Sequence, residues 1–483
     1  MIFNSLSFLI FFPVVTILYF LLPHKWRWVH LLVASSIFYM SFIPAYLLIL
    51  FFLILVDYIT GLAIYNTKTI YKKRLYLILS ILSMLLVLFI FKYFNFVNIN
   101  VAWLAQFIGW NYSYATLTLL LPIGLSFHTF QSLSYVIEVY RGKQKPEKHI
   151  GIYALYVMFY PQLVAGPIER PYHMLHQFHE KHSFNKDNFV FGLKRMLWGF
   201  FKKIVIADNL AVIVNLVYGN PSDFSGTALI IATFFFAFQI YCDFSGYCDI
   251  ALGAAQIMGF RMMENFRRPY LARSIPDFWR RWHISLSTWF RDYVYISLGG
   301  SKVSIPRWYL NLFLVFMISG LWHGANWTFV IWGALHGVYM IVYVSYDSLM
   351  KRVPSVNSFL LRKEFRMLSV ILSTMLTFIL ASFAWIFFRA QSLSDAWIII
   401  TRMFSGLSLD LASQGLGMGW LGLMFYLSLI GLLMFVQSLQ EKNIDVYLTK
   451  KPVALQWLVF FTLGTTILLF GVFETTSFIY FQF

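Results

Sequence analysis

One apolar stretch holds the residues with the clearest chemical potential. Gly320–Trp327 places His323 between a tryptophan and a glycine, and a second histidine, His336, follows it. Ionisable groups are costly inside a membrane, so a histidine there is by default a candidate for function. A neutral imidazole titrates near neutral pH and can take a proton from a hydroxyl group. The stretch therefore predicts histidine-assisted acyl or group transfer at membrane depth.

Basic residues at 302–307 and 351–352 bound this stretch. If both lie on one side of a membrane, residues 309–347 form a re-entrant pair or a hairpin. At 1.5 Å per residue, His323 and His336 then lie about 22 Å along the two arms, near a turn containing glycine and asparagine. Irregular backbone at that depth is tolerated only inside protein or beside a water-filled cavity.

Catalysis is not the only role open to these histidines. The polar atoms of His323 could simply be satisfied by neighbouring backbone or by tyrosine and aspartate side chains. A metal site has little support, because His323 and His336 have no evident third ligand and Cys242 and Cys248 have no suitably spaced companions. Neither a G-x-S-x-G nucleophile elbow nor a phosphate-binding P-loop is present in the sequence.

Arginines crowd between 261 and 307, and Pro276-Asp277 favours the start of a helix there. A helical wheel from 277 gathers an aromatic face, made of Trp279, Trp282, Leu286, Trp289, Phe290 and Tyr293. It gathers a polar face from Arg280, His283, Ser287 and Arg291. We expect this helix at the cytoplasmic interface, with its aromatic face in the membrane. The alternative is a lipid-interface helix without chemistry, which leaves a histidine among polar partners unexplained.

Three further polar stretches interrupt the apolar chain, at 122–141, 160–171 and 239–249. The prolines and glycine of 160–171 favour a broken, re-entrant segment. For most polar residues in these stretches, hydrogen bonds between helices, worth about 0.6 kcal/mol on average, are a sufficient explanation. Asp243 and Asp249 are six residues apart and hence on different helix faces, so they are not a catalytic carboxylate pair.

The composition predicts an all-α, polytopic membrane protein. Of the 483 residues, 60% are hydrophobic and only 12% are charged, about half the charged fraction of soluble domains. We expect about 11–12 crossings, with re-entrant and interfacial helices in addition. One membrane domain, 1–483, would hold N-terminal spans at 1–115, a catalytic core at 116–347 and C-terminal spans at 348–483. The candidate spans are 3–22, 28–43, 46–64, 75–96, 114–139, 150–166, 189–219 (broken), 225–259, 309–329, 328–347, 367–388, 421–438 and 454–475.

The formal charge of +17 is explained by basic loops on one membrane face, without nucleic acid as a partner. Such a face also attracts anionic lipid or a phosphorylated cytosolic ligand. Basic loops at 24–27, 68–74 and 141–148 are placed in the cytoplasm, and 97–112, without Lys or Arg, is placed outside. The stretches 351–366 and 441–451 are basic or mixed, whereas 405–420 has no Lys or Arg. This pattern predicts that the C-terminus lies outside, and the N-terminus is predicted to lie outside as well.

Several of these motifs together resemble the membrane-bound O-acyltransferase (MBOAT) family. The resemblance is to its bacterial branch, which includes alginate O-acetyltransferase and the D-alanyl transferase of teichoic acids. The most specific feature is Arg281-Trp282-His283 followed by Leu321-Trp322-His323-Gly324. The matching segments are Gly124–Gly142, Gln162–Pro171, Gln239–Gly253, Asn265–Leu286 and Gly320–Gly337. His128 stands where the family more usually has a tyrosine before Thr-Phe-Gln.

The resemblance implies the MBOAT fold and roles for particular residues. His323 would be the catalytic histidine, as base or transient acyl carrier. His283 would be the second functional histidine, near the cytoplasmic entrance. Two funnels in the protein would meet near His323. Donor-binding residues at that entrance would be Arg280, Arg281, Trp282 and Ser287. Supporting or channel residues would be Trp322, Asn326, Asp243 and His336.

The resemblance also implies the substrates and surroundings of the protein. Acetyl-CoA would be the acyl donor, with no bound cofactor. The acetyl group would pass to a periplasmic SGNH-type acetyltransferase or another acyl-accepting partner, and finally to a polysaccharide such as alginate. The location would be the bacterial cytoplasmic (inner) membrane, in contact with membrane lipids. Two alternatives stay open: D-alanyl transfer from a carrier-protein thioester to teichoic acid, and a transporter or flippase, although no inverted repeat is visible.

Overall fold

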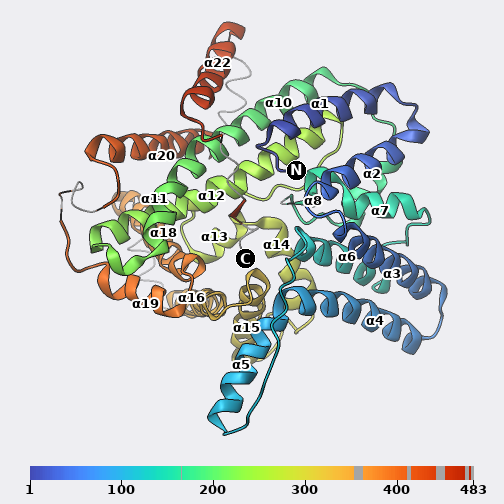
Figure 1. The fold of residues 1–483 in the computed structure, drawn as a ribbon, viewed down its shortest axis with the longest axis horizontal. Coiled ribbons are helices and arrows are strands. Elements are labelled where there is room, and N and C mark those ends of the chain that lie inside the picture. The colour runs from blue at the N-terminus through green and yellow to red at the C-terminus, as the bar shows by residue number, and fades with distance from the viewer. Residues whose placement is uncertain are drawn as a thin grey trace. The chain divides into compact units, whose positions relative to one another are not determined.

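The computed structural model describes residues 1–164, 166–352, 363–408, 410, 415–441, 452–473 and 478–479, and these contain helices but no strand. The chain forms two compact units, and Figure 1 labels the helices that belong to them. Unit 1 comprises Met1–Met196 and Tyr247–Met263, and unit 2 comprises Leu197–Gly246 and Glu264–Phe483. These boundaries do not follow the predicted subdivision of one membrane domain at 115/116 and 347/348, which stays a prediction.

Unit 1 consists of helices joined by short turns and one longer extended segment. Pro122 and Gly124 end that segment, and Gly124 takes a positive φ of 75° where α6 begins, a conformation that glycine adopts without strain. Its helices are α1 (Leu6–Leu21), α2 (His24–Met40), α3 (Tyr46–Asn66), α4 (Ile70–Leu88), η1 (Phe89–Tyr93), α5 (Phe94–Phe107), α6 (Leu125–Tyr140), α7 (Ile150–Met158), α8 (Tyr160–Leu163), α9 (Pro171–His179) and most of α10 (Lys186–Phe200).

Unit 2 contains every residue that the sequence nominated for catalysis or donor binding. The long helix α12 (Gly226–Ile257) contributes its first part to this unit and its last part to unit 1. The other elements are η2 (Phe201–Ala207), α11 (Asp208–Gly219), η3 (Pro221–Asp223), η4 (Pro269–Leu271), α13 (Ile275–Arg281), α14 (Ile284–Trp289), η5 (Phe290–Tyr295), α15 (Ile305–His323), α16 (Trp327–Arg352), α18 (Lys363–Arg389), α19 (Leu393–Arg402), α20 (Trp420–Glu441) and α22 (Val453–Phe470).

The predicted hairpin is present as α15 and α16, which are separated by only three residues. Two glycines let the helices approach closely: an ideal Cβ on Gly320 would lie 3.2 Å from the Cα of Gly333 and would overlap the carbonyl oxygen of Phe329. Small residues at such crossings are typical of membrane helix pairs, which associate by close packing. The crossing fixes the end of α15, where His323 lies.

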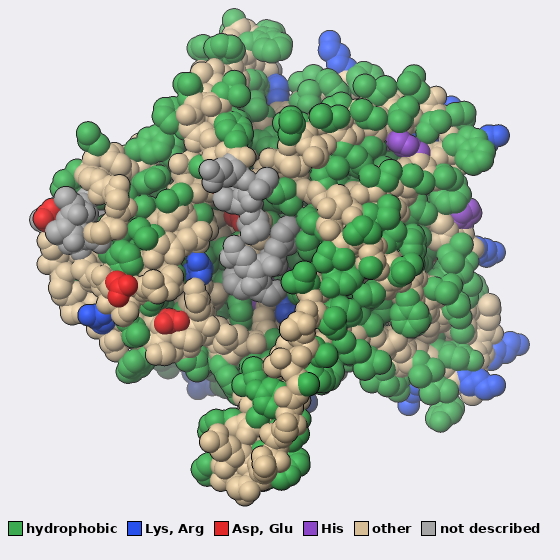
Figure 2. Space-filling view, viewed as in Figure 1, with side chains coloured by type: hydrophobic (Ala, Val, Ile, Leu, Met, Phe, Trp, Pro, Cys, Tyr) green, Lys and Arg blue, Asp and Glu red, His purple; other side chains and the backbone are tan. Residues whose placement is uncertain are grey.

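The structure confirms an all-α, multi-pass membrane protein. Eight helices of the described chain are long and apolar enough to cross a membrane, and α1 is a shorter apolar helix. Many large apolar side chains are exposed, such as Leu421 at 89% and Phe107 at 80%. Figure 2 shows hydrophobic side chains over most of the visible surface of the unit 1 helices. A surface of this kind is stable in contact with lipid acyl chains and unfavourable in water.

Several predicted spans differ from the observed helices. The 114–139 candidate begins as a helix only at Leu125, and the 150–166 candidate consists of the short helices α7 and α8. The candidate at 189–219 is one helical run, α10–η2–α11, in which a π-helical segment replaces the expected break. Most of the stretches 351–366 and 441–451, and part of 405–420, lie outside the described residues.

Candidate active site

His323 is the last residue of α15 and is 5% exposed. Its ring lies among three aromatic rings, with centroid distances of 4.8 Å to Trp322, 4.9 Å to Trp332 and 5.3 Å to Phe388. The helix ends here because Gly324 adopts an extended conformation. His323 is therefore held by apolar walls at a helix end, where a change of charge on the imidazole is poorly screened.

His283 lies in the same unit and packs near the same tryptophan. It is fully buried, and its ring meets Phe244 edge-on at 4.7 Å and Trp322 at 6.4 Å between centroids. Its backbone is left-handed, with φ of 43°. A non-glycine residue in this conformation is uncommon, and such strain is concentrated at functional sites. Trp322 thus has the rings of both nominated histidines as neighbours.

The prediction of a single continuous helix from residue 277 is wrong. α13 ends at Arg281, Trp282 is extended, and α14 begins after the left-handed His283. The predicted lipid contact of the aromatic face is also wrong, because Trp279, Trp282 and Trp289 are each at most 8% exposed. The chain changes direction at His283, so residues that a single helical wheel places on one face point in different directions. The polar face is divided in the same way, since Arg280 is exposed and His283 is buried.

The four nominated donor-binding residues occupy different environments. Arg280 is exposed, and Ser287 Oγ donates a hydrogen bond to the Trp282 carbonyl oxygen at 3.1 Å. Arg281 is ion-paired with Asp277 at 2.9 Å and with Glu441 at 3.2 Å. Trp282 is 1% exposed and stacks on Phe278 with a centroid distance of 5.6 Å. Burial suits Trp282 to packing, so a donor-binding role for these residues stays a prediction.

His336 belongs to the layer behind Trp332. Its Nδ1 accepts a hydrogen bond from Trp279 Nε1 at 3.3 Å, and its ring lies 5.0 Å from that of Trp332. Trp332 itself contacts His323, so His336 packs one ring away from His323, and a supporting role for His336 stays a prediction. Asn326 caps the next helix: its Oδ1 accepts from Thr328 N at 3.1 Å, and its Nδ2 donates to the Gln391 carbonyl at 3.2 Å.

Asp243 is part of a buried ion cluster that the sequence did not lead us to predict. Lys203 Nζ lies 2.7 Å from an Asp243 oxygen and 2.8 Å from an Asp208 oxygen, and all three side chains are at most 5% exposed. The other Asp243 oxygen accepts a hydrogen bond from the backbone N–H of Ile479 at 2.8 Å. A lysine inside an apolar run was the available signal, because a buried ammonium group requires carboxylate partners. Asp243 therefore anchors structure in unit 2.

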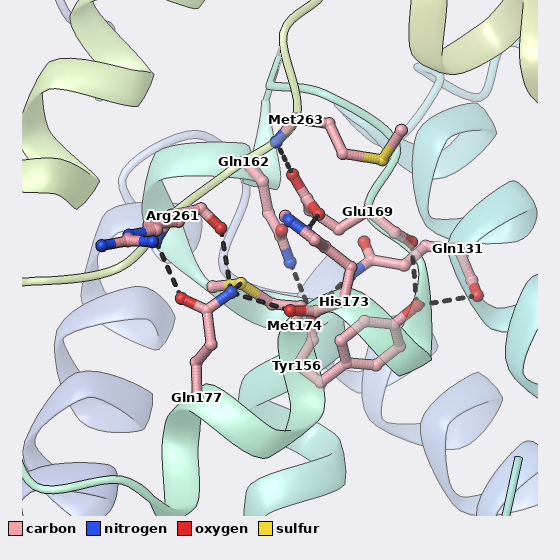
Figure 3. Close-up of polar contacts among 9 residues, drawn as sticks. All are labelled: Gln131, Tyr156, Gln162, Glu169, His173, Met174, Gln177, Arg261 and Met263. Carbon is pink, nitrogen blue, oxygen red and sulfur yellow. Dashed lines mark hydrogen bonds and ion pairs between the residues drawn. The ribbon is translucent and has the colours of Figure 1, made fainter.

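A second polar cluster, in unit 1, explains the Gln162–Pro171 motif (Figure 3). Buried Glu169 accepts hydrogen bonds from Met263 N at 2.6 Å and pairs with His173 Nδ1 at 2.7 Å. Gln177 donates to the Arg261 carbonyl at 2.9 Å and accepts from Arg261 N at 2.8 Å. These side chains satisfy the backbone that follows α12, so the cluster positions a loop. The hydrogen bond to Glu169 raises the pKa of His173.

Potential metal ligands occur at most in pairs in the described part of the chain, such as Glu169 with His173 at 2.7 Å. Across those residues, no three or more His, Cys, Asp or Glu side chains are grouped so that they could hold a metal ion. Cys242 and Cys248 are both buried thiols that form no disulfide.

Burial of His283 makes stability depend on pH. His283 lies outside the eight apolar helices, and desolvation lowers its pKa from 6.5 to about 3. The folded protein thus holds this ring neutral while the unfolded chain protonates it, so its contribution to stability is complete above about pH 6.5 and is lost as pH falls towards 3. The slope is at most about 1.4 kcal/mol per pH unit.

We expect the apparent Tm of the wild-type protein in nanodiscs to fall more than that of His283→Gln between about pH 7.5 and pH 5.5. Glutamine does not titrate and can still donate a hydrogen bond. The matched control is His176→Gln, because His176 has a side chain that is 57% exposed, and this variant should follow the wild type. Parallel curves for wild type and His283→Gln would contradict the prediction.

Comparison with known proteins defines the class. The model of the membrane-bound O-acyltransferase family matches residues 149–362. The probable alginate O-acetylase AlgI of Pseudomonas aeruginosa is 41% identical over 409 residues, covering 84% of this chain and 75% of the relative. The peptidoglycan O-acetyltransferase of Helicobacter pylori is 36% identical over 449 residues, covering 85% and 81%. The teichoic acid D-alanyltransferase of Bacillus subtilis is 30% identical over 244 residues, covering 48% and 60%.

The chain belongs to the membrane-bound O-acyltransferase family. It is a multi-pass membrane enzyme of the O-acyltransferase class. The sequence-based prediction of the family is confirmed.

Proposed function

We propose that this protein transfers acetyl groups from cytoplasmic acetyl-CoA across the bacterial inner membrane for O-acetylation of an extracytoplasmic polysaccharide. The observation that carries the proposal is the pair of buried histidines, His323 and His283, whose rings both neighbour that of Trp322 in a membrane O-acyltransferase. Acetyl is favoured as the acyl group because the alginate O-acetylase and peptidoglycan O-acetyltransferase relatives, which match 84% and 85% of this chain, are named for O-acetylation. The D-alanyltransferase relative matches 48% of it.

In the proposed reaction His323 acts as a general base. It takes the proton of an acceptor hydroxyl while the hydroxyl oxygen attacks the thioester carbonyl carbon. The carbon–sulfur bond then breaks, an ester forms, and the proton passes to the departing CoA thiolate. In the variant of this mechanism with an acyl-histidine, His323 itself is acetylated first and the acceptor oxygen displaces it. Exposed Arg280 attracts the CoA phosphates electrostatically.

The acceptor partner is proposed to be a periplasmic SGNH-type acetyltransferase, which passes the group to alginate, peptidoglycan or another polysaccharide. Placement of the basic loops in the cytoplasm is the reason for assigning the donor to that side. No step in this reaction requires a bound cofactor.

The experiment is acetyl transfer from radiolabelled acetyl-CoA by the purified protein in nanodiscs, with and without the candidate partner. We expect partner-dependent label transfer, or slow hydrolysis of the thioester without the partner. A D-alanyl carrier-protein thioester, supplied in parallel, tests the second acyl group. Turnover of that thioester alone would overturn acetyl transfer in favour of D-alanyl transfer, and turnover of neither would overturn the proposed reaction.

A further inference from the structure

We propose that Asn265 is the positioning residue that fixes the ring tautomer of His283, so that Nδ1 carries the proton and Nε2 presents the basic lone pair. The consequence for acyl transfer rests on the proposed function, whereas the tautomer is a property of the folded protein and can be measured separately.

The orientation of the Asn265 amide follows from its neighbours. The backbone N–H of Ser285, which can only donate, lies 3.1 Å from one terminal atom of the amide, and Ser285 Oγ lies 2.8 Å from that atom. That atom must therefore be the oxygen, Oδ1. His283 Nδ1 lies 3.2 Å from this same oxygen. An amide oxygen cannot donate a hydrogen bond, so the proton of this contact belongs to His283 Nδ1.

A neutral imidazole carries one N–H, so the proton on Nδ1 leaves the lone pair on Nε2. The ring is neutral because its full burial lowers the pKa well below physiological pH. Asn265 and Ser285 are at most 1% exposed. In such an environment water competes poorly for the ring nitrogens, and the hydrogen bond of one nitrogen decides which form is present.

The surrounding backbone is arranged to hold this contact. Ile284 N donates to the Asn265 carbonyl at 2.9 Å, and Arg267 N donates to the Arg281 carbonyl at 2.9 Å. These bonds join the segment containing Asn265 to the turn containing His283, whose left-handed conformation is strained for a residue other than glycine. The strained turn and the buried acceptor together point the His283 ring in one direction.

The functional consequence concerns catalysis and not folding alone. A ring with its proton on Nε2 presents a donor at the position where the wild-type ring presents a lone pair, even when every other group, including the proposed base His323, is in place. Partners that orient metal-bound histidines typically contribute about 10–100-fold to metal affinity or activity, and we expect the same order of effect for a partner that orients His283. We therefore expect Asn265→Leu to lower kcat about 10–100-fold with little change in KM, because leucine cannot accept from Nδ1.

The test compares Asn265→Leu, Asn265→Asp and Ser285→Ala in the full-length protein in nanodiscs. Nitrogen-15 NMR of histidine-labelled protein reports which ring nitrogen is protonated, and the His283 signal is assigned as the one missing in His283→Gln. We expect the proton on Nδ1 in the wild type, in Asn265→Asp and in Ser285→Ala. Ser285→Ala is the matched control, because it removes another donor to the same oxygen and keeps the acceptor for His283. In Asn265→Leu we expect the proton on Nε2.

A pH profile keeps the inference testable if the leucine variant does not fold. A carboxylate in Asn265→Asp keeps the acceptor and stabilises the imidazolium form, so the apparent Tm of this variant should fall less than that of the wild type between about pH 7.5 and pH 5.5. An apparent Tm of Asn265→Asp that falls as much as that of the wild type, a proton on Nε2 in the wild type, or a proton that stays on Nδ1 in Asn265→Leu would each overturn the inference. If the tautomer changes as expected while the wild type transfers no acyl group, the proposed function fails and the inference stands.

Discussion

Replacing His323 with alanine is expected to abolish measurable acetyl transfer, with a fall of about 10²–10⁴-fold, the range that a general base contributes. The imidazole is the ionisable group at the end of α15, and the aromatic rings that surround it cannot accept a proton. The measurement is label transfer from acetyl-CoA to the partner protein, in nanodiscs containing equal amounts of each variant.

Two controls separate loss of chemistry from loss of structure. His176→Ala changes an exposed histidine of α9 and should retain full activity. The amount and apparent Tm of His323→Ala should fall far less than its activity, because alanine removes the contacts of a single ring and keeps the helical backbone of α15. Normal acetyl transfer by a well-folded His323→Ala protein would show that His323 is not required for the reaction. His283 would then be the remaining candidate.

Gly320→Ala is expected to destabilise the α15–α16 hairpin strongly. A Cβ at this position would overlap the carbonyl oxygen of Phe329, and backbone cannot move aside as a flexible side chain can. Separating α15 from α16 should cost about 1–3 kcal/mol or more and displace His323, which follows three residues later. We expect a lower apparent Tm, less protein in the membrane and reduced acetyl transfer.

The matched control is the same substitution at Gly431, in α20, where nothing lies within 4 Å of the added Cβ. There alanine restricts the unfolded chain and should be neutral or stabilising by about 0.5–1 kcal/mol. Opposite signs at the two glycines identify the helix crossing as the cause. Equal effects at both would show that helix propensity, and not the close approach at Gly320, decides the outcome.

The two expected results address different parts of the protein. A large loss of acetyl transfer with little loss of stability indicates a chemical role, and we expect this result for the His323 variant. Loss of both together is the signature of a positioning element, and the Gly320 variant should show that. His283→Gln can then test whether acetyl transfer also requires His283, the ring that we propose to be oriented by its hydrogen bond to Asn265.

Local pattern determined the fold class, the hairpin and the nominated histidines. Apolar runs of spanning length can satisfy their backbone only as helices, so an all-α membrane protein followed from composition and length. The turn at Gly324–Asn326 was visible because glycine and asparagine interrupt two such runs. His323 was identified because ionisable groups are rare and costly in apolar surroundings. His283 was identified on a polar helix face and by the family resemblance, and the motifs around both histidines indicated the family that the comparisons confirm.

Tertiary structure decided what those residues contact. A helical wheel assumes one continuous helix, and it failed at Trp282–His283 because a left-handed residue supported by Asn265 redirects the chain. Arg281 forms an ion pair with Glu441, and Lys203 forms one with Asp243, each distant in sequence from its partner. The amino-acid sequence alone therefore determined which groups had to be buried or paired. Their partners depended on contacts across many residues, which no local periodicity encodes.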